Sequence, residues 1–166
     1  GMKALASEAV SLLSGKPPEA KGFGCQLAFN IIPGDASSDR EYQAADTLLE
    51  SQIRQLCGDP GFPVSVNLAT APVFFGTICQ LDIETSESVD VESLQTALSQ
   101  DDWFRLSEQP TPVTEGVGEY NIVVGNVRKD DQTGYRLSMW VVLDNVKTGA
   151  ARHAFVLGKV LQKNFQ

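Results

Sequence analysis

The segment at residues 135–143 constrains the fold most, because its centre is apolar at consecutive positions. The run Met139-Trp140-Val141-Val142 forms that centre. A strand points successive side chains to opposite faces, so such a run predicts a strand that is covered on both sides. We therefore expect a central strand in a layered sheet. A chain of 166 residues is long enough to bury it in one domain with a real core.

The rest of the chain alternates between predicted helices and predicted strands. Helical spacing of apolar residues, or period-two alternation, distinguishes the two. A capping box, with Ser38 at the N-cap and Glu41 three residues later, begins one of the helices. The predicted helices cover residues 3–13, 38–56, 89–99 and 149–165, and the predicted strands cover residues 25–32, 64–69, 73–84, 121–127 and 135–143. This order predicts an α+β fold, with a mixed, mainly antiparallel sheet flanked by helices.

Two polar residues interrupt faces that are otherwise apolar. Gln52 lies on the inner stripe of the second predicted helix, which is made by Ala45, Leu48, Leu49, Ile53 and Leu56. Thr77 lies on the strand face that carries Val73, Phe75, Cys79, Leu81 and Ile83. Both side chains are therefore predicted to face inward.

Charge and cysteine usage exclude several classes of protein. The net charge of -8 disfavours binding to nucleic acid or to an anionic membrane surface. No apolar run approaches the roughly 18 to 20 residues needed to cross a bilayer, and the first residues do not resemble a signal peptide. Three widely separated cysteines, Cys25, Cys57 and Cys79, fit free thiols in a reducing cytoplasm. A single histidine makes a zinc site very hard to build.

No motif carries chemistry by itself. His153 could act as a general base, but its place in a helix close to Gly149 favours a structural role. Cys25 and Cys79 lie in apolar strands, where a thiolate is not favoured. The Gly116-Val117-Gly118 run precedes a strand rather than a helix, so it predicts no dinucleotide site. Asp130-Asp131 fits a solvated hairpin loop. The residues alone indicate a cytoplasmic α+β domain.

Three segments, in order along the chain, resemble the aspartate-semialdehyde dehydrogenase family. They correspond to the family's Ala-Phe-Asn-x-x-Pro strand, its Val-Pro-Val-Phe-x-Gly strand, and its Trp-x-x-x-Asp-Asn segment with a Gly-Ala-Ala run. In this chain they read Gln26-Leu27-Ala28-Phe29-Asn30-Ile31-Ile32-Pro33, Ala71-Pro72-Val73-Phe74-Phe75-Gly76, and Trp140-Val141-Val142-Leu143-Asp144-Asn145 followed by Lys147-Thr148-Gly149-Ala150-Ala151. The likeness runs nearly from end to end, and it is nearest to the Usg-type paralogues.

The resemblance implies that residues 1–166 are one C-terminal dimerisation and substrate domain, with the fold of the C-terminal domain of glyceraldehyde-3-phosphate dehydrogenase. In that family an N-terminal Rossmann domain binds NADP, and a cysteine attacks the aldehyde to give a thioester. Both the cysteine and the cofactor site are expected upstream of this chain, which itself binds no cofactor. The C-terminal domain supplies the general base, a substrate arginine and the dimer interface.

Carried over by position, the classical catalytic residues are replaced. The family's substrate arginine falls at Thr70, its base histidine at Thr77, and its acidic contact to the substrate amino group at Gln52. Threonine has no guanidinium fork for a carboxylate, and its hydroxyl does not accept a proton near neutral pH. Glutamine does not balance an ammonium charge. Family members also place an asparagine near His153.

The leading hypothesis is a homodimerising, substrate-side domain without the classical catalytic residues, inactive by itself. The alternative is the C-terminal half of an active NAD(P)-dependent semialdehyde dehydrogenase for a different, uncharged substrate. A small-ligand sensor that reuses the former pocket is a third possibility. The dimer is expected to form through the sheet and the C-terminal segment, because 135–143 and 149–165 are the most apolar elements.

Overall fold

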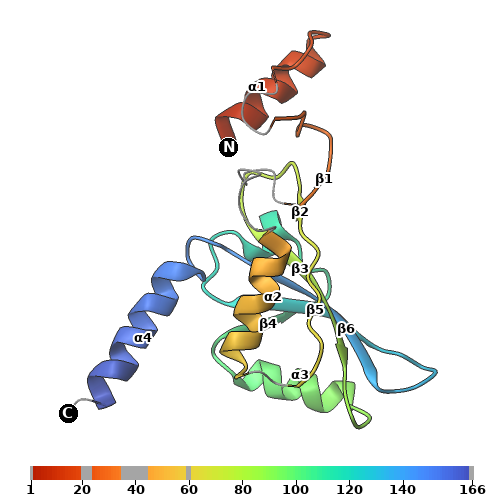
Figure 1. Ribbon diagram of the computed structural model, residues 1–166, viewed down its shortest axis with the longest axis vertical. Coiled ribbons are helices and arrows are strands. Elements are labelled where there is room, and N and C mark those ends of the chain that lie inside the picture. The colour runs from red at the N-terminus through yellow and green to blue at the C-terminus, as the bar shows by residue number, and fades with distance from the viewer. Residues whose placement is uncertain (1, 20–23, 35–44, 59–60, 165–166) are drawn as a thin grey trace. The chain divides into compact units, whose positions relative to one another are not determined.

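The structure of the chain, a computed structural model, describes residues 2–19, 24–34, 45–58 and 61–164. It divides into two compact units, Gly1–Phe74 and Phe75–Gln166. The helices are α1 (Met2–Leu13), α2 (Ala45–Leu56), α3 (Val91–Gln100) and α4 (Ala150–Asn164), with a short π-helical turn η1 (Pro112–Gly116). The strands are β1 (Ile32–Pro33), β2 (Ala69–Thr70), β3 (Thr77–Glu84), β4 (Phe104–Ser107), β5 (Ile122–Lys129) and β6 (Arg136–Leu143) (Figure 1). The predicted capping box at Ser38 lies outside the described residues.

The second unit is built on a four-stranded sheet with the order β3-β6-β5-β4. β6 is antiparallel to both β3 and β5, whereas β4 is parallel to β5. The mixed, mainly antiparallel sheet of the predicted α+β class is therefore confirmed. So is the central position of the apolar strand, since Leu137, Met139 and Val142 of β6 are buried.

Elements on the sheet bury its middle strands. η1 packs on β6, β3 and β5, and α3 packs on β4 and β5. A Cβ atom added at Gly116 of η1 would lie 2.5 Å from Cγ1 of Val142, so only glycine permits this close approach. Val123 and Val142 have no exposed surface at all. β4 and η1 were not predicted from the sequence.

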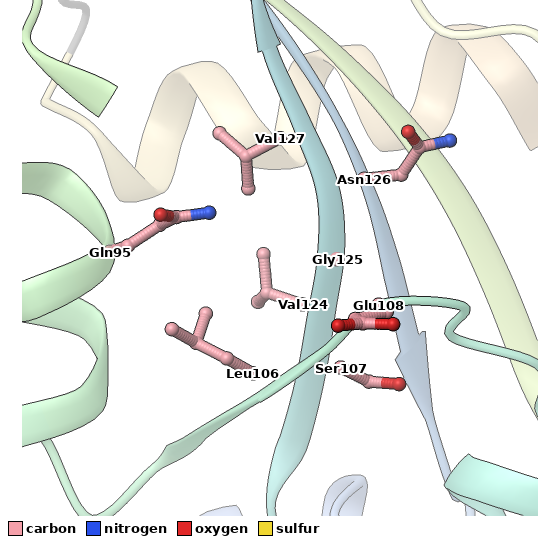
Figure 2. A pocket seen from close by; sticks show the side chains of 8 residues that line it. All are labelled: Gln95, Leu106, Ser107, Glu108, Val124, Gly125, Asn126 and Val127. Carbon is pink, nitrogen blue, oxygen red and sulfur yellow. The ribbon is translucent and has the colours of Figure 1, made fainter. Parts of the chain in front are cut away.

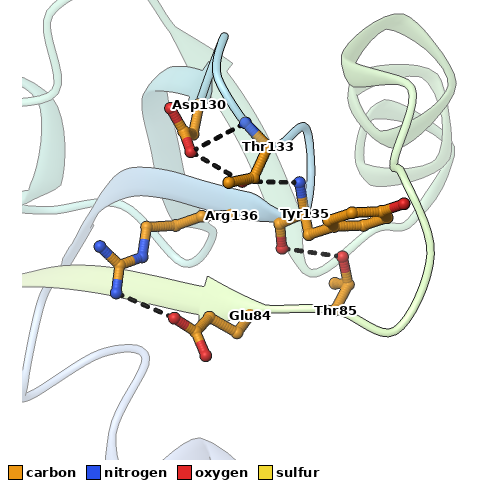
Figure 3. A network of polar contacts seen from close by, with 6 residues as sticks. All are labelled: Glu84, Thr85, Asp130, Thr133, Tyr135 and Arg136. Carbon is orange, nitrogen blue, oxygen red and sulfur yellow. Dashed lines mark hydrogen bonds and ion pairs between the residues drawn. The ribbon is translucent and has the colours of Figure 1, made fainter.

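A hairpin of β5 and β6 extends beyond this core, and its loop is held by side chains. Asp130 accepts hydrogen bonds from the hydroxyl and the N–H of Thr133, at 2.7 and 3.3 Å. At the base of the loop, Arg136 of β6 forms an ion pair of 3.0 Å with Glu84 of β3 (Figure 3). The predicted solvated loop is therefore a structured turn, and its acidic residue has a structural role.

The first unit has a small core of its own, in which α1 packs on the segment at residues 27–32. Leu5, Leu27 and Ala28 are buried there, and Ala9, Leu12 and Ile32 pack against them. The long strand predicted at residues 25–32 is wrong, because Phe29 has a left-handed backbone (φ 59°) that ends any extended run. Only Ile32 and Pro33 pair, with Thr70 and Ala69.

Side chains of α2 explain why the strand predicted at residues 64–69 is also shorter. Arg54 donates to the Val64 carbonyl at 3.2 Å, and Glu50 accepts from the Val66 N–H at 2.9 Å. These backbone groups are thus bonded to a helix rather than to a neighbouring strand. The strand predicted from residue 73 begins only at Thr77, because Gly76 turns the chain with φ 86°.

Candidate functional site

Thr70, predicted from the sequence resemblance to stand in place of a substrate arginine, lies half-buried on β2. Its hydroxyl donates to the Gly34 carbonyl at 3.2 Å, next to the β1–β2 pairing. This contact gives the side chain a structural role in the first unit. A hydroxyl offers a carboxylate one neutral hydrogen bond, where a guanidinium offers a charged, bidentate pair.

Gln52 and Thr77, predicted to face inward, are both exposed. Gln52 lies on α2, none of whose residues is buried; Leu48 and Ile53 of its apolar stripe are 45% and 36% exposed. Thr77 is the first residue of β3, where every residue is exposed. The prediction of inward faces is therefore wrong for both, because an alternating pattern identifies an apolar face but not what covers it. The structure places Gln52 and Thr70 in the first unit and Thr77 in the second.

Cysteine, histidine and carboxylate side chains do not form a reactive group in the part of the chain that is described. Cys25, Cys57 and Cys79 form no disulfide and lie at the surface. Partial burial raises the pKa of the Cys79 thiol, which disfavours the nucleophilic thiolate. Among the described residues, no three His, Cys, Asp or Glu side chains could hold a metal ion.

The glycines at 116 and 118 are engaged by the fold, so they do not fit a dinucleotide phosphate. Gly116 packs on Val142, and the Gly118 N–H donates to the Asp144 carboxylate at 2.9 Å. The same carboxylate accepts from the N–H groups of Val146 and Lys147 at 2.8 and 3.0 Å. These backbone bonds, that of Gly118 above all, hold the pKa of Asp144 below its usual range. Asp144 thus fastens the start of the segment that leads into α4.

His153 belongs to an aromatic and cationic cluster that sequence reasoning did not find. Its ring lies 5.5 Å from the Trp103 ring, and the Arg152 guanidinium stacks 3.9 Å from the centre of the same indole. The Lys147 ammonium lies 4.8 Å from the Tyr120 ring. These contacts anchor the first turns of α4 beside β4, which agrees with the structural reading of the histidine. The members of this cluster are far apart in the sequence, so no regular spacing between them could have predicted it.

A shallow hollow of about 360 Å³ lies between α3 and β5. The side chains of Gln95, Leu106, Val124 and Val127 converge on it (Figure 2). Ser107, Glu108 and Asn126 also line it, so its lining mixes polar and apolar side chains. It contains none of the positions predicted from the family.

The comparison that decides the family is a match to the domain described as "Semialdehyde dehydrogenase, dimerisation domain", over residues 1–148. The chain belongs to this family. The match spans α1 through β6 and stops just before α4. The resemblance stated from the sequence motifs is confirmed.

Curated relatives of this dimerisation domain are about twice as long as the chain. It is 32% identical to "Aspartate-semialdehyde dehydrogenase 2" of Vibrio cholerae, over 99% of the chain and 50% of the relative. It is 31% identical to a "USG-1 protein homolog" of Pseudomonas aeruginosa, over the same shares. The chain thus spans about half the length of these relatives.

Solved structures agree with the fold of the dimerisation domain. Aspartate semialdehyde dehydrogenase II from Vibrio cholerae, solved in a complex with ASA, matches 99% of the chain and 50% of its own, with TM-score 0.87 and 31% identity. A probable aspartate-semialdehyde dehydrogenase from Pseudomonas aeruginosa covers the same shares with TM-score 0.89 and 30% identity. The chain therefore has the fold of the C-terminal domains of these proteins.

Apolar side chains of the chain remain uncovered on β3 and α4 in the described structure. On β3, Leu81 and Ile83 share one face and are 37% and 40% exposed, and Ile78, on the opposite face, is 44% exposed. On α4 the exposed side chains are Phe155, Leu157, Val160 and Leu161. None of the described helices has the length and apolar character needed to cross a membrane.

Glu8 is a further residue that sequence reasoning missed. It is only 1% exposed, the least accessible charged side chain of the described structure. The signal was available, since Glu8 lies three residues after Leu5 and four before Leu12, on the apolar stripe of α1.

Proposed function

We propose that this chain is the self-associating, substrate-side domain of an aspartate-semialdehyde dehydrogenase-like protein that has lost the classical catalytic residues. The observation that carries the proposal is the match to the family's dimerisation domain over residues 1–148, combined with threonine at 70 and 77. The structural bond of Thr70 to Gly34 supports it, because the side chain serves the fold rather than a ligand.

The whole protein would pair this domain, residues 1–166, with an N-terminal Rossmann domain that binds NADP. Support comes from the relatives, of which the chain covers only 50%. We expect the whole protein to be cytoplasmic and to belong to amino-acid biosynthesis, and the name aspartate-semialdehyde dehydrogenase carried by a relative supports the aspartate pathway. The chain itself would contribute no cofactor contact, since its glycine run is engaged by Val142 and Asp144.

A second candidate is the C-terminal half of an active NAD(P)-dependent dehydrogenase for an uncharged aldehyde. The 32% identity to a named dehydrogenase favours it. Thr70, Thr77 and Gln52 would then line a neutral pocket instead of a charged one. The sequence upstream separates the two candidates: a cysteine at the nucleophile position with an intact glycine fingerprint supports an enzyme.

Self-association is expected to give a two-fold homodimer through the sheet and the C-terminal segment. The exposed apolar residues of β3 and α4 supply surface of the kind that proteins bury against a partner, and closed two-fold pairing is the commonest arrangement. Because α4 lies outside the matched dimerisation domain, its apolar face could instead serve the remainder of the longer protein.

Light scattering on the purified chain tests the dimer. We expect twice the monomer mass of 17.9 kDa at tens of micromolar. Because a monomer and its dimer are in a mass-action equilibrium, the mass should fall toward the monomer value upon dilution. A monomer mass that holds across this range contradicts the proposal.

A steady-state assay tests the missing chemistry. With aspartate semialdehyde, NADP and phosphate, the chain should produce no NADPH above a blank without protein. One reason is that the family's nucleophile and cofactor site are expected in the N-terminal domain. The other is that Thr70 and Thr77 provide neither a carboxylate clamp nor a proton acceptor. Turnover clearly above the blank would show that the catalytic set is present after all.

A further inference from the structure

A buried carboxylate on α1 holds the loop at residues 26–31. One oxygen of Glu8, Oε2, accepts the N–H groups of Leu27 and Ala28 at 2.8 and 3.0 Å. Glu8 is 1% exposed, and Leu27 and Ala28 are 2% and 1% exposed. The charge is thus enclosed in the small apolar core of the first unit, where an unpaired carboxylate is expensive.

The second oxygen of the same carboxylate is buried without a partner. Oε1 of Glu8 accepts no hydrogen bond from any described residue. A buried side-chain oxygen without a hydrogen-bond partner needs an explanation. The two charge-assisted bonds to the loop supply one, because a carboxylate holds N–H donors more tightly than a neutral acceptor does.

What the carboxylate holds is a strained turn. Phe29 follows Ala28 directly and has φ 59°, a left-handed conformation that bulky residues rarely adopt. Asn30 reinforces the turn, because its side chain donates to the Gln26 carbonyl at 3.0 Å and accepts from the Ile31 N–H at 2.9 Å. The turn reverses the direction of the side chains, so that buried Ala28 is followed by an aromatic ring that is 67% exposed.

We propose that Glu8 locks this turn so that Phe29 and Ile31 form an apolar contact for a second copy of the chain. Ile31 is 65% exposed, so this short loop presents two large exposed apolar side chains, Phe29 and Ile31. Strained backbone that persists under such constraint is commonly found at functional contacts. Glu8 is then a positioning residue, and Phe29 is the residue that touches the partner.

A second copy is the occupant that the observations favour. The match to the dimerisation domain includes all of α1 and this loop, whereas α4 lies outside it. A two-fold pair through the matched domain needs apolar surface within the matched residues, and aromatic side chains, Phe among them, are enriched in protein–protein interfaces. The inference rests on the proposed self-association and adds a specific surface to it.

Phe29→Gly in the full 166-residue chain is the decisive variant. Glycine adopts a positive φ without strain, so the change should leave the thermal stability of the monomer intact. Sedimentation equilibrium should show a dimer dissociation constant raised about tenfold or more, as for the loss of a central aromatic contact. Phe62→Gly is the matched control, since Phe62 is a comparably exposed ring, at 54%, in the same unit. It should leave the constant unchanged.

Glu8→Gln, alone and combined with Phe29→Gly, tests the positioning role. The amide keeps an acceptor for the loop but loses the charge, so the dimer constant should rise. In the double variant Glu8→Gln should add nothing further, because its effect passes through Phe29. Additive effects would overturn the role of Glu8, and a dimer insensitive to Phe29→Gly would overturn the contact while leaving self-association standing. A wild-type chain that is monomeric would overturn both.

Discussion

The Asp144 carboxylate makes the stability of the folded chain depend on pH. It is 8% exposed and accepts three backbone N–H groups, from Gly118, Val146 and Lys147. These donors lower the pKa of Asp144 in the folded chain. The stabilisation that they provide is therefore present above the unfolded pKa of about 3.9, and is lost as the pH falls through the lower folded value.

Asp144→Asn should lower the melting temperature at neutral pH. The new amide has one oxygen, so it cannot accept hydrogen bonds from all three N–H groups. Its NH2 group, itself a donor, would face either the Gly118 N–H or the N–H groups of Val146 and Lys147. Thermal unfolding from pH 7 down to about pH 3 measures the effect, and the gap between parent and variant should narrow toward the acidic end. Asp131→Asn makes the same change of charge at an exposed residue and controls for it. A gap that stays constant with pH would mean that the carboxylate charge is not involved.

Elements were predictable where local pattern and tertiary packing agree. β6 was predicted because both faces of its apolar run can be buried only in the middle of a sheet. α1, α3 and α4 were predicted from the helical spacing of their apolar residues. The strands predicted at residues 25–32 and 64–69 are short or absent, because side chains of Glu8, Arg54 and Glu50 take backbone groups that a strand would need. β4 carries only four residues, too few for a periodic signal.

The same limit applies to the candidate site. The positions Thr70, Thr77 and Gln52 came from a resemblance, and periodicity added only that two of them interrupt apolar faces. Periodicity cannot say whether a face is covered, and for α2 and β3 it is exposed in the described structure. The cluster of Trp103 with Arg152 joins residues that are far apart in sequence, so no local pattern predicts it.

At concentrations where the chain is monomeric, Phe155→Glu on α4 should change its free energy of unfolding by no more than about 0.5 kcal/mol, as for an ordinary surface substitution. Phe155 is 63% exposed, and the new carboxylate would lie one turn before Lys159, a favourable helical spacing. Leu137→Glu provides the contrast, because Leu137 is 4% exposed on β6 and a charge there should unfold the sheet. Urea denaturation of both variants is the measurement. A loss of well over about 1 kcal/mol for Phe155→Glu under these conditions would mean that α4 is covered within the monomer.

For the whole molecule, association and catalysis make separate demands on the same fold. The sheet keeps its buried middle strands and its uncovered β3 whatever stands at positions 70 and 77. A dimerisation domain can therefore lose charged site residues without losing its architecture. The net charge of -8 opposes non-specific aggregation through mutual repulsion of the chains, and specific pairing must overcome the same repulsion.

Restoring the family residues with Thr70→Arg, Thr77→His and Gln52→Glu should not create a dehydrogenase from this chain. Members of a catalytic unit act together, so a base and a clamp without the nucleophile and the cofactor domain contribute almost nothing. The change in stability should come mainly from Thr70, because its hydroxyl bonds to Gly34, whereas Gln52 and Thr77 are exposed and accept charge readily. The NADPH assay and thermal unfolding of the triple variant, beside Thr77→His with Gln52→Glu alone, measure both effects. Turnover in the triple variant would contradict the loss of function. If the double variant is destabilised as much as the triple variant, the side chains at 52 and 77 are covered in solution.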